Sequence, residues 1–333
     1  MKPIQSTPTL ILLFIFNLLQ AQYTDVINSN RPGVSRSAFS VGTNVLQFEV
    51  GPFILKEKRT PPLRNEVSGF GVDFAARYGL FFEQLELNVE GTYQNDTKTY
   101  FSSIPFEEDR SNFKYVALGA KYLIYDPYKN ADDKPNLYSW KANHRFKWRS
   151  LIPAVSLYVG ANYDTKYNPY TASGIEGFSP KVMLATQNNF SGGWVFVLNL
   201  IKDRIGTDQS DFQYILTLTH SFDPQWVIFG ETQGIKSDFY ADNLFRVGGA
   251  YLWNANFQLD TALTFNTKDT PSVFSVNFGA SYRFDFHQDK EEEEIDNGAS
   301  VMDGGRRKSR RNKANKTSGS TIKKQRRDSI DFD

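Results

Sequence analysis

The chain has 333 residues, of which 40% are hydrophobic, 15% aromatic and 23% charged, with a formal net charge of +1 and no cysteine. The absence of cysteine excludes a disulfide framework, thiol chemistry and a lipidated cysteine after a signal sequence. Charged residues are unevenly distributed. Residues 1–286 are nearly neutral overall, and residues 287–333 are rich in both acidic and basic residues.

The first 21 residues have the features of a secretory signal peptide. Lys2 supplies the positive start, residues 10–19 the apolar run, and Ala21 the small residue before cleavage at Gln22. Such an apolar run is too short to cross a bilayer as a helix, which leaves an uncleaved anchor as the less favoured alternative. No later stretch has about 18 consecutive apolar residues, so membrane residence must depend on strands. Residues 22–43 are expected to form a periplasmic segment before the first strand.

Runs of alternating apolar and polar side chains dominate residues 44–286. In the clearest run, 274–286, aromatic and aliphatic residues hold one parity while serine, asparagine, glycine and charged residues hold the other. Alternation of this kind indicates a strand with one apolar and one polar face. Because the pattern recurs behind a secretory signal, we predict an all-β fold, a transmembrane antiparallel β-barrel with lipid outside and polar groups inside.

Twelve strands are predicted in this region. They span residues 44–55, 67–80, 83–94, 113–125, 151–163, 178–188, 193–202, 211–221, 225–236, 243–254, 256–266 and 273–286. Two of them, 193–202 and 225–236, are ambiguous because apolar residues fall on both parities.

Connection lengths alternate along the chain. The short connections lie at residues 81–82, 189–192, 222–224 and 254–256, and the long ones include 56–66, 95–112 and 164–177. Bacterial barrels have short periplasmic turns and long outer loops. We therefore expect a barrel in the outer membrane of a Gram-negative bacterium with both termini in the periplasm.

The connection at residues 126–150 breaks this alternation, because it is long where a periplasmic turn is expected. It mixes aromatic residues such as Trp140 and Trp148 with basic ones such as Lys141 and Arg145. We interpret it as a short amphipathic helix at the inner interface, where both residue types are favoured. A hairpin missed by the strand count is the alternative.

The polar face of the predicted barrel carries acidic and basic side chains in similar number. Charges inside a narrow barrel must pair or face water, which offsets the cost of burial. They either fill the interior as paired or solvated groups or form a selectivity lining for a solute. The mixed signs predict no strong preference for anions or cations. The lumen candidates are Glu49, Asp73, Arg77, Glu86, Glu90, Lys121, Lys181, Glu231, Arg246, Asp260, Arg283 and Asp285.

Catalysis, a metal and a cofactor are not expected. Adjacent His220 and Ser221 would lie on opposite faces of a strand, beyond the reach of a proton relay. The chain has three scattered histidines and no cysteine, which gives no zinc spacing. The Gly-Gly pairs lack the helix that follows a phosphate-binding loop.

Residues 287–333 follow the last predicted strand and become acidic and then strongly basic. Having almost no apolar residues, they are predicted to form a disordered periplasmic tail. In an intracellular protein such a run suggests nucleic acid, but behind a signal peptide and a barrel we predict no nucleic-acid partner. The tail is either a solvated extension or a contact for a periplasmic protein or an anionic cell-wall surface. The contact candidates are Arg306, Arg307, Lys308, Arg310, Arg311, Lys323, Lys324, Arg326 and Arg327.

The start of the mature chain, with Asn-Arg-Pro-Gly at residues 30–33 and Leu-Gln-Phe-Glu-Val-Gly at 46–51, resembles a family of outer-membrane transporter-like proteins named for the MetA pathway of phenol degradation. Three later stretches fit the same family, at residues 77–80 with 85–87, at 119–123 and at 228–234. The similarity covers about residues 28–286 and implies uptake of small aromatic compounds. The chain departs from the family at Asn30, where aspartate is usual, in the 126–150 insert and in the tail.

The opening motif also has a structural interpretation. Pro32 and Gly33 predict a turn, and Arg31 is predicted to fold into the periplasmic mouth to meet a lumen carboxylate, Glu49 or Glu231. A plug of this sort would gate the pore or close it at rest. An ordinary N-terminal turn is the alternative.

The sequence favours a passive channel or transporter for a small, aromatic or hydrophobic solute, inserted into outer-membrane lipid by the barrel assembly machinery. The alternative is a non-transporting structural subunit of an outer-membrane or periplasmic assembly, which would use the insert and the tail as contact surfaces. A continuous lumen would favour the channel. A lumen blocked by side chains, with proteins that co-purify through the tail, would favour the structural subunit.

Overall fold

The computed structural model describes residues 26–62, 64–129, 148–172 and 174–286. The predicted signal peptide, most of the 126–150 insert and the predicted tail with its basic contact candidates lie outside the described residues.

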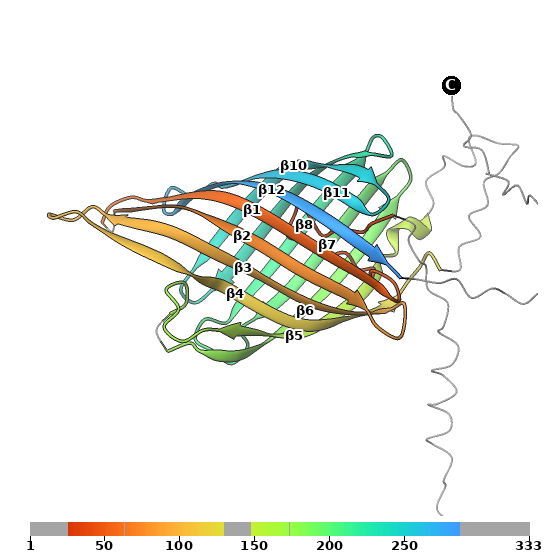
Figure 1. Ribbon diagram of the computed structural model, residues 1–333, viewed down its shortest axis with the longest axis horizontal. Helices are drawn as coiled ribbons and strands as arrows, with labels where there is room; N and C mark the ends of the chain where they lie inside the picture. Colours follow the sequence, from red (N-terminus) through yellow and green to blue (C-terminus); the bar gives the residue numbers. More distant parts are fainter. Residues whose placement is uncertain (1–25, 63, 130–147, 173, 287–333) are drawn as a thin grey trace, which may run out of the picture. The chain divides into compact units, whose positions relative to one another are not determined.

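Twelve antiparallel strands close into one barrel (Figure 1). Each strand pairs with its neighbours in sequence, and β1 closes the ring against β12, with Val45 opposite Asp285 and Lys58 opposite Ser272. Closure satisfies backbone hydrogen-bonding groups that a bilayer cannot satisfy. The strands are β1 (Val45–Arg59), β2 (Asn65–Gly79), β3 (Leu85–Tyr100), β4 (Phe106–Tyr125), β5 (Ala154–Asp164), β6 (Gly177–Phe190), β7 (Trp194–Asp203), β8 (Asp211–Ser221), β9 (Trp226–Ser237), β10 (Ala241–Asn254), β11 (Phe257–Asn266) and β12 (Ser272–Asp285).

The alternating pattern separates the two faces as predicted. On β12, Phe278 and Phe284 are 55% and 42% exposed on the outer wall, whereas Ser281 and Arg283 are 0% and 3% exposed inside the barrel. This arrangement places apolar side chains against lipid and polar ones in the lumen. The prediction of a transmembrane barrel is therefore confirmed.

Aromatic side chains gather on the outer surface at the end where the first strand begins and the last strand ends. Phe81, Trp148, Trp226, Trp253 and Phe286 are each at least half exposed there. Aromatic rings are favoured at a membrane–water interface, where their apolar body meets the acyl chains and their polar edge meets water. These residues mark one boundary of the membrane-spanning wall. No helix within the described ranges is long and apolar enough to cross a bilayer.

All twelve predicted strands are present, and the main differences lie at the opposite end of the barrel. Residues 95–112, predicted as a loop, instead continue β3 to Tyr100 and start β4 at Phe106, where the two rings stack with centroids 4.4 Å apart. Outside the membrane both faces of a strand meet water, so alternation is lost while cross-strand hydrogen bonding continues. The hairpins of β1–β2 and β3–β4 consequently project beyond the other strands (Figure 1).

The described part of the 126–150 insert lies against β6. Trp148–Leu151 forms a short 3-10 helix (η1), and the Asn188 side chain donates to the Ser150 carbonyl oxygen at 3.0 Å. The backbone N–H of Asn189 donates to the Tyr128 hydroxyl at 2.7 Å. The insert is thus attached to the barrel end at both of its described edges, while the predicted amphipathic helix falls outside the described residues.

Candidate functional site

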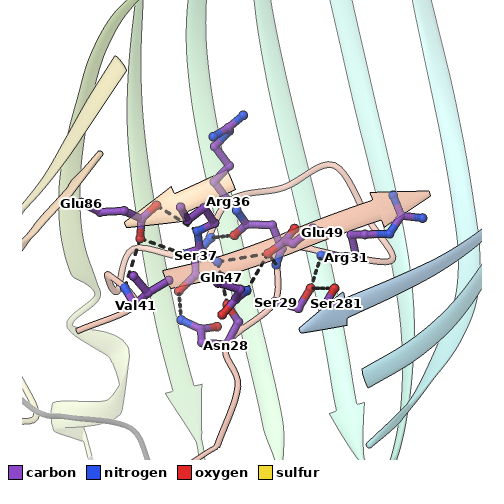
Figure 2. A network of polar contacts seen from close by, with 12 residues as sticks. Asn28, Ser29, Arg31, Arg36, Ser37, Val41, Gln47, Glu49, Glu86 and Ser281 are labelled. Carbon is purple, nitrogen blue, oxygen red and sulfur yellow. Dashed lines mark hydrogen bonds and ion pairs between the residues drawn. The ribbon is translucent and has the colours of Figure 1, made fainter. Parts of the chain in front are cut away.

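The chain ahead of β1 enters the barrel and fills part of its lumen. We call residues 26–43 the plug segment. It starts with the backbone N–H of Ile27 donating to the Ala255 carbonyl oxygen at 2.8 Å and ends where Asn44 donates to the Gly79 carbonyl oxygen at 3.0 Å. Between these two points it binds side chains on β1, β2, β3, β4, β6, β7, β9, β11 and β12. Figure 2 shows its contacts with Glu49, Glu86 and Ser281. The plug segment is thus held from strands all around the barrel.

Glu231 on β9 is one of the main anchors of the plug segment. Its carboxylate accepts the backbone N–H groups of Val34 and Ser35 at 3.2 and 3.1 Å. The same carboxylate accepts the Thr217 hydroxyl at 2.8 Å and pairs with the Arg246 guanidinium at 3.0 Å. A backbone segment that leaves water needs partners for its N–H groups, and a carboxylate is a strong acceptor for them.

Arg31 projects from the plug segment to the inner wall, where it pairs with Asp260 on β11 at 3.2 Å. It also donates to the Phe278 carbonyl oxygen at 3.2 Å. The guanidinium occupies the space where side chains at Gly51 and Gly279 would otherwise begin. Two inward-facing glycines, on β1 and β12, therefore form the pocket for Arg31.

This arrangement corrects the sequence-based prediction for the opening motif. The partner of Arg31 is Asp260, whereas Glu49 and Glu231 bind backbone N–H groups of the plug segment. Gly33 lies so close to the Glu231 carboxylate that a Cβ atom would collide with it. The motif therefore provides one charge and one close backbone approach, and each is matched to a different carboxylate.

A buried charge cluster lies beneath the plug segment. Arg77 on β2 makes a two-bond contact with Glu86 on β3, both bonds at 2.9 Å, and it also contacts Glu49 at 3.3 Å. Lys121 on β4 approaches Glu86 at 3.3 Å. Arg77 additionally donates to the carbonyl oxygen of Asn28 at 2.6 Å, which ties the cluster to the plug segment.

Lys121 and Gln187 bind the next part of the plug segment, residues 37–39. The Lys121 ammonium donates to the carbonyl oxygens of Ser37 and Phe39 at 3.0 and 2.8 Å. The hydroxyl of Ser37 donates to the Gln187 side chain at 2.8 Å, and the Ala38 backbone N–H reaches the same oxygen at 3.3 Å. The wall therefore binds both N–H and carbonyl groups of the plug backbone.

Arg36 extends along the wall formed by β3 to β7. Its backbone N–H and carbonyl oxygen bond both ends of the Asn199 amide, at 2.6 and 2.9 Å. Its guanidinium forms an ion pair with Glu90, which Lys181 also approaches at 3.3 Å, and lies 5.5 Å from the centre of the Tyr158 ring. Arg36 is thus the second charged side chain that fastens the plug segment.

One sector of the inner wall is apolar, which the sequence analysis did not predict. Tyr158 on β5, Met183 on β6, Ile201 on β7 and Ile215 on β8 form a cluster with exposures between 0% and 6%. They lie on the inward parity of their strands, beside the Arg36 contact with Tyr158. This sector accounts for the ambiguous alternation of residues 193–202.

The structure places the predicted lumen residues on the inner wall and brings most of them together around the plug segment. Those that contact the segment directly are Glu49, Arg77, Glu86, Glu90, Lys121, Glu231 and Asp260. Lys181 and Arg246 pair with members of this group. Asp73 instead accepts the Thr92 hydroxyl at 2.6 Å, and Arg283 approaches Asp285 at 3.6 Å. A role for any of them in solute selectivity stays a prediction.

Several residues that bind the plug segment were missed from the sequence. Gln47, Gln187, Asn199 and Ser281 all contact it, yet they are uncharged and resemble any polar residue on an inward parity. Only their parity could have marked them as lumen residues. Nothing in the sequence marked Gly51 and Gly279 as the pocket for Arg31. The absence of a side chain is informative only once the group that fills the space is known.

No group of three or more histidine, cysteine, aspartate or glutamate side chains suited to a metal ion occurs among the residues that the structure describes. His220 stacks on Trp194 with ring centres 4.2 Å apart. At the far end of the barrel, the Tyr170 hydroxyl donates to carbonyl oxygens of Gln94 and Arg110 at 3.1 and 3.2 Å. Burial, together with the nearby Asp96 carboxylate, raises the pKa of Tyr170, so this contact is held by a neutral phenol.

Comparison with known proteins gives one match in sequence and several in fold. The family model described as "Putative MetA-pathway of phenol degradation" matches residues 29–284. No curated protein matches the chain in sequence. Among solved structures, an outer membrane channel from Pseudomonas putida F1 is similar over 78% of this chain and 100% of its own, with 12% identity and a TM-score of 0.48.

Two further solved structures are also similar to this chain. The KdgM porin is similar over 71% of this chain and 99% of its own, with 11% identity and a TM-score of 0.40. The translocator domain of the autotransporter NalP from Neisseria meningitidis is similar over 77% of this chain and 90% of its own, with 10% identity and a TM-score of 0.41. At such identities and scores these similarities concern the fold, and nothing about activity follows from them.

Proposed function

We propose that this chain, which belongs to the family described as the putative MetA pathway of phenol degradation, is an outer-membrane channel for small solutes whose lumen is closed at rest by its own plug segment. The observation that carries this proposal is the chemistry of the plug contacts. The segment is fastened mainly by hydrogen bonds and ion pairs to the inner wall, with Arg31 and Glu231 at its centre.

Contacts of this kind suit a plug that leaves and returns. A hydrogen bond within a protein replaces one with water, so its net contribution is only about 0.5–1.5 kcal/mol. When the plug segment withdraws, Glu231, Asp260 and Lys121 become accessible to lumen water and are hydrated again. An apolar packing of the same size would lose its whole hydrophobic contribution on exposure to water. The polar wall therefore lowers the free-energy cost of opening.

The arrangement of the barrel ends supports a periplasmic location for both termini. The projecting hairpins of β1–β2 and β3–β4 lie at the end of the barrel away from the start of β1 and the end of β12. In bacterial barrels the larger elements are extracellular and the periplasmic turns are short. The plug segment then closes the periplasmic half of the lumen.

The apolar sector of the inner wall supports a solute with an apolar part. Tyr158, Met183, Ile201 and Ile215 lie next to Arg36, so withdrawal of the plug segment would uncover an apolar surface inside a polar lumen. An aromatic ring can pack against such a surface, while its polar substituent meets the surrounding charges. We propose small aromatic or hydrophobic solutes on this basis.

A reversible lock on the plug segment tests the proposal. The hydroxyl oxygens of Ser29 and Ser281 are 2.8 Å apart, and the chain contains no cysteine that could interfere. In a Ser29→Cys/Ser281→Cys variant, an oxidant should form a disulfide that fixes the segment to β12. We expect planar bilayers containing the oxidised variant to stay silent and to show intermittent openings after reduction, when the plug segment can leave and return. The Ser281→Cys variant alone should conduct identically under both conditions.

The opposite result would favour the second candidate function. If the reduced variant and the unmodified protein are both silent, and removal of the plug segment gives no conductance either, the channel proposal fails. The filled lumen would then indicate a non-transporting structural subunit of an outer-membrane assembly.

A further inference from the structure

A pair of lysines stands on the outer wall of the barrel at the end away from the termini. Lys202 on β7 and Lys236 on β9 are both exposed, and both lie directly opposite Phe212 on the intervening strand β8. Because neighbouring strands are about 4.8 Å apart, the two lysines are separated by about 10 Å across the wall. Within the described part of the chain, neither ammonium group has an ion-pair partner at the salt-bridge distance.

The wall below the lysines changes from amphipathic to apolar. The next cross-strand row contains Tyr214, Gly234 and Asn243, and the Asn243 side-chain oxygen accepts the hydroxyls of Tyr214 and Thr232 at 3.4 and 3.1 Å. Hydroxyl and amide groups on a lipid-facing wall belong at the level of the headgroup and ester region, where polar atoms find partners.

A groove of about 400 Å³ opens in the wall below this row. Its outward lining includes Phe196, Leu218, Gly230, Phe245 and Val247. A Cβ atom at Gly230 would meet no atom within 4 Å, so the missing side chain contributes to the hollow. Gly230 lies near the middle of β9, and the groove therefore lies at the depth of acyl chains.

We propose that this wall is a binding site for a phosphorylated glycolipid of the outer leaflet, with a phosphate at Lys202 and Lys236 and an acyl chain in the groove at Gly230. The proposal rests on the orientation given above, which puts the lysines at the extracellular end. The charge of the two lysines and the depth of the groove both fit an anionic lipid. Two cations lie at the level of the anionic headgroup, hydroxyl and amide groups follow, and an apolar groove lies where the tail must run.

A second copy of the chain fits this wall less well. Pairing across a twofold axis would bring the same patch of each subunit together, so that unpaired lysines would face lysines. Like charges held together in this way oppose association. The chemistry of the wall thus favours an anionic lipid over self-association.

The test measures binding of purified rough-type lipopolysaccharide to the detergent-solubilised full-length chain by native mass spectrometry. Two lysine contacts with an anionic headgroup correspond to about a thirtyfold change in the dissociation constant. The Lys202→Gln/Lys236→Gln variant should show that loss. The matched control is Lys56→Gln/Lys58→Gln, which removes two lysines from the same end of β1, where Lys58 already pairs with Glu66 at 3.5 Å. The control should bind as the unmodified protein does.

Two further measurements separate headgroup from tail. Dephosphorylated lipopolysaccharide should bind the unmodified protein as weakly as the intact lipid binds the lysine variant. Gly230→Leu, whose Cβ would meet no atom within 4 Å and whose side chain would occupy the groove, should weaken binding of the intact lipid severalfold with both lysines in place.

Unchanged binding in the lysine variant, an equal loss in the control, or equal binding of the dephosphorylated lipid would each overturn the proposal. Dimers that the lysine variant alone disrupts would overturn it in favour of self-association. Because the measurement is made in detergent, its failure leaves the channel proposal standing, and a silent channel leaves the lipid result standing.

Discussion

Arg31 in the plug segment and Asp260 on β11 are 229 positions apart in the sequence, and their charged groups lie 3.2 Å apart inside the barrel. The two side chains are only 9% and 0% exposed. Burial of a charge costs free energy unless the charge is paired, and here each side chain offsets the burial cost of the other. This pair joins the plug segment to β11, and in the proposed channel it is the latch of the closed state.

Replacing Asp260 with asparagine should open the lumen. Removing one member of a buried ion pair typically costs about 3–5 kcal/mol, and here the plug segment can escape that cost by moving Arg31 into water. We expect a higher open fraction in planar bilayers and faster protease cleavage of the plug segment. Asp285→Asn is the control, because Asp285 pairs with Arg283 at 3.6 Å away from the plug contacts. Silent bilayers with Asp260→Asn would contradict the assignment of this pair as the latch.

Filling the pocket of Arg31 should have the same effect without altering any charge. A leucine at Gly279 would occupy the space of the guanidinium and displace it from Asp260. The barrel should still assemble, because the displaced side chain moves into the lumen. We expect increased solute flux into liposomes, measured against Gly230→Ala, which adds a methyl group where nothing lies within 4 Å. Equal flux in the two variants would show that the pocket does not control the plug segment.

Arg77 should be essential to barrel stability as well as to closure. Its removal would leave the Glu49 and Glu86 carboxylates, which it contacts at 3.3 and 2.9 Å, without their main counter-charge. We expect Arg77→Ala to lower the free energy of unfolding by about 3–5 kcal/mol, measured by urea denaturation in detergent and by heat-dependent gel mobility. Arg77→Lys keeps the charge and should recover part of this loss. A fully stable alanine variant would mean that water or Lys121 neutralises the two carboxylates.

The assignment of faces can be checked on β12. Phe278 is 55% exposed on the outer wall near the middle of the strand, and its neighbour Asn277 points into the lumen. A lysine on the lipid face near the bilayer midplane costs about 2–4 kcal/mol. Phe278→Lys should therefore reduce the amount of assembled barrel in the membrane fraction, while Asn277→Lys should not. The reverse order would mean that the inner and outer faces are interchanged.

Truncation after Phe286 should leave the barrel intact, because β12 ends at Asp285 and its pairing with β1 is complete there. The eleven lysine and arginine residues between 306 and 327 are proposed to bind an anionic periplasmic surface or an acidic protein. Exposed charge contacts weaken as salt shortens the Debye length to about 10 Å at 0.1 M. Any salt-sensitive partner should therefore disappear from the truncated protein, and a truncated protein that retains every partner would identify the tail as a solvated extension.

The number and facing of the strands follow from the sequence because alternation is local. In residues 274–286 each side chain shows by its own polarity whether it meets lipid or water, and no distant contact is needed to decide it. The same reasoning fails at residues 95–112, where both faces are wet and only the pairing of β3 with β4 shows that the strands continue. Parity likewise placed Glu231 and Asp260 in the lumen without indicating what either one binds.

The sequence alone determined a twelve-stranded transmembrane barrel with charges inside, because lipid and water impose a period of two on every spanning strand. Only the tertiary structure decided that Arg31 pairs with Asp260, that Gly51 and Gly279 make room for it, and that Glu231 binds the backbone of Val34 and Ser35. These contacts join segments far apart in the sequence, with 229 positions between Arg31 and Asp260. They depend on how far the plug segment reaches across a closed barrel, and that distance exists only once the strands have paired.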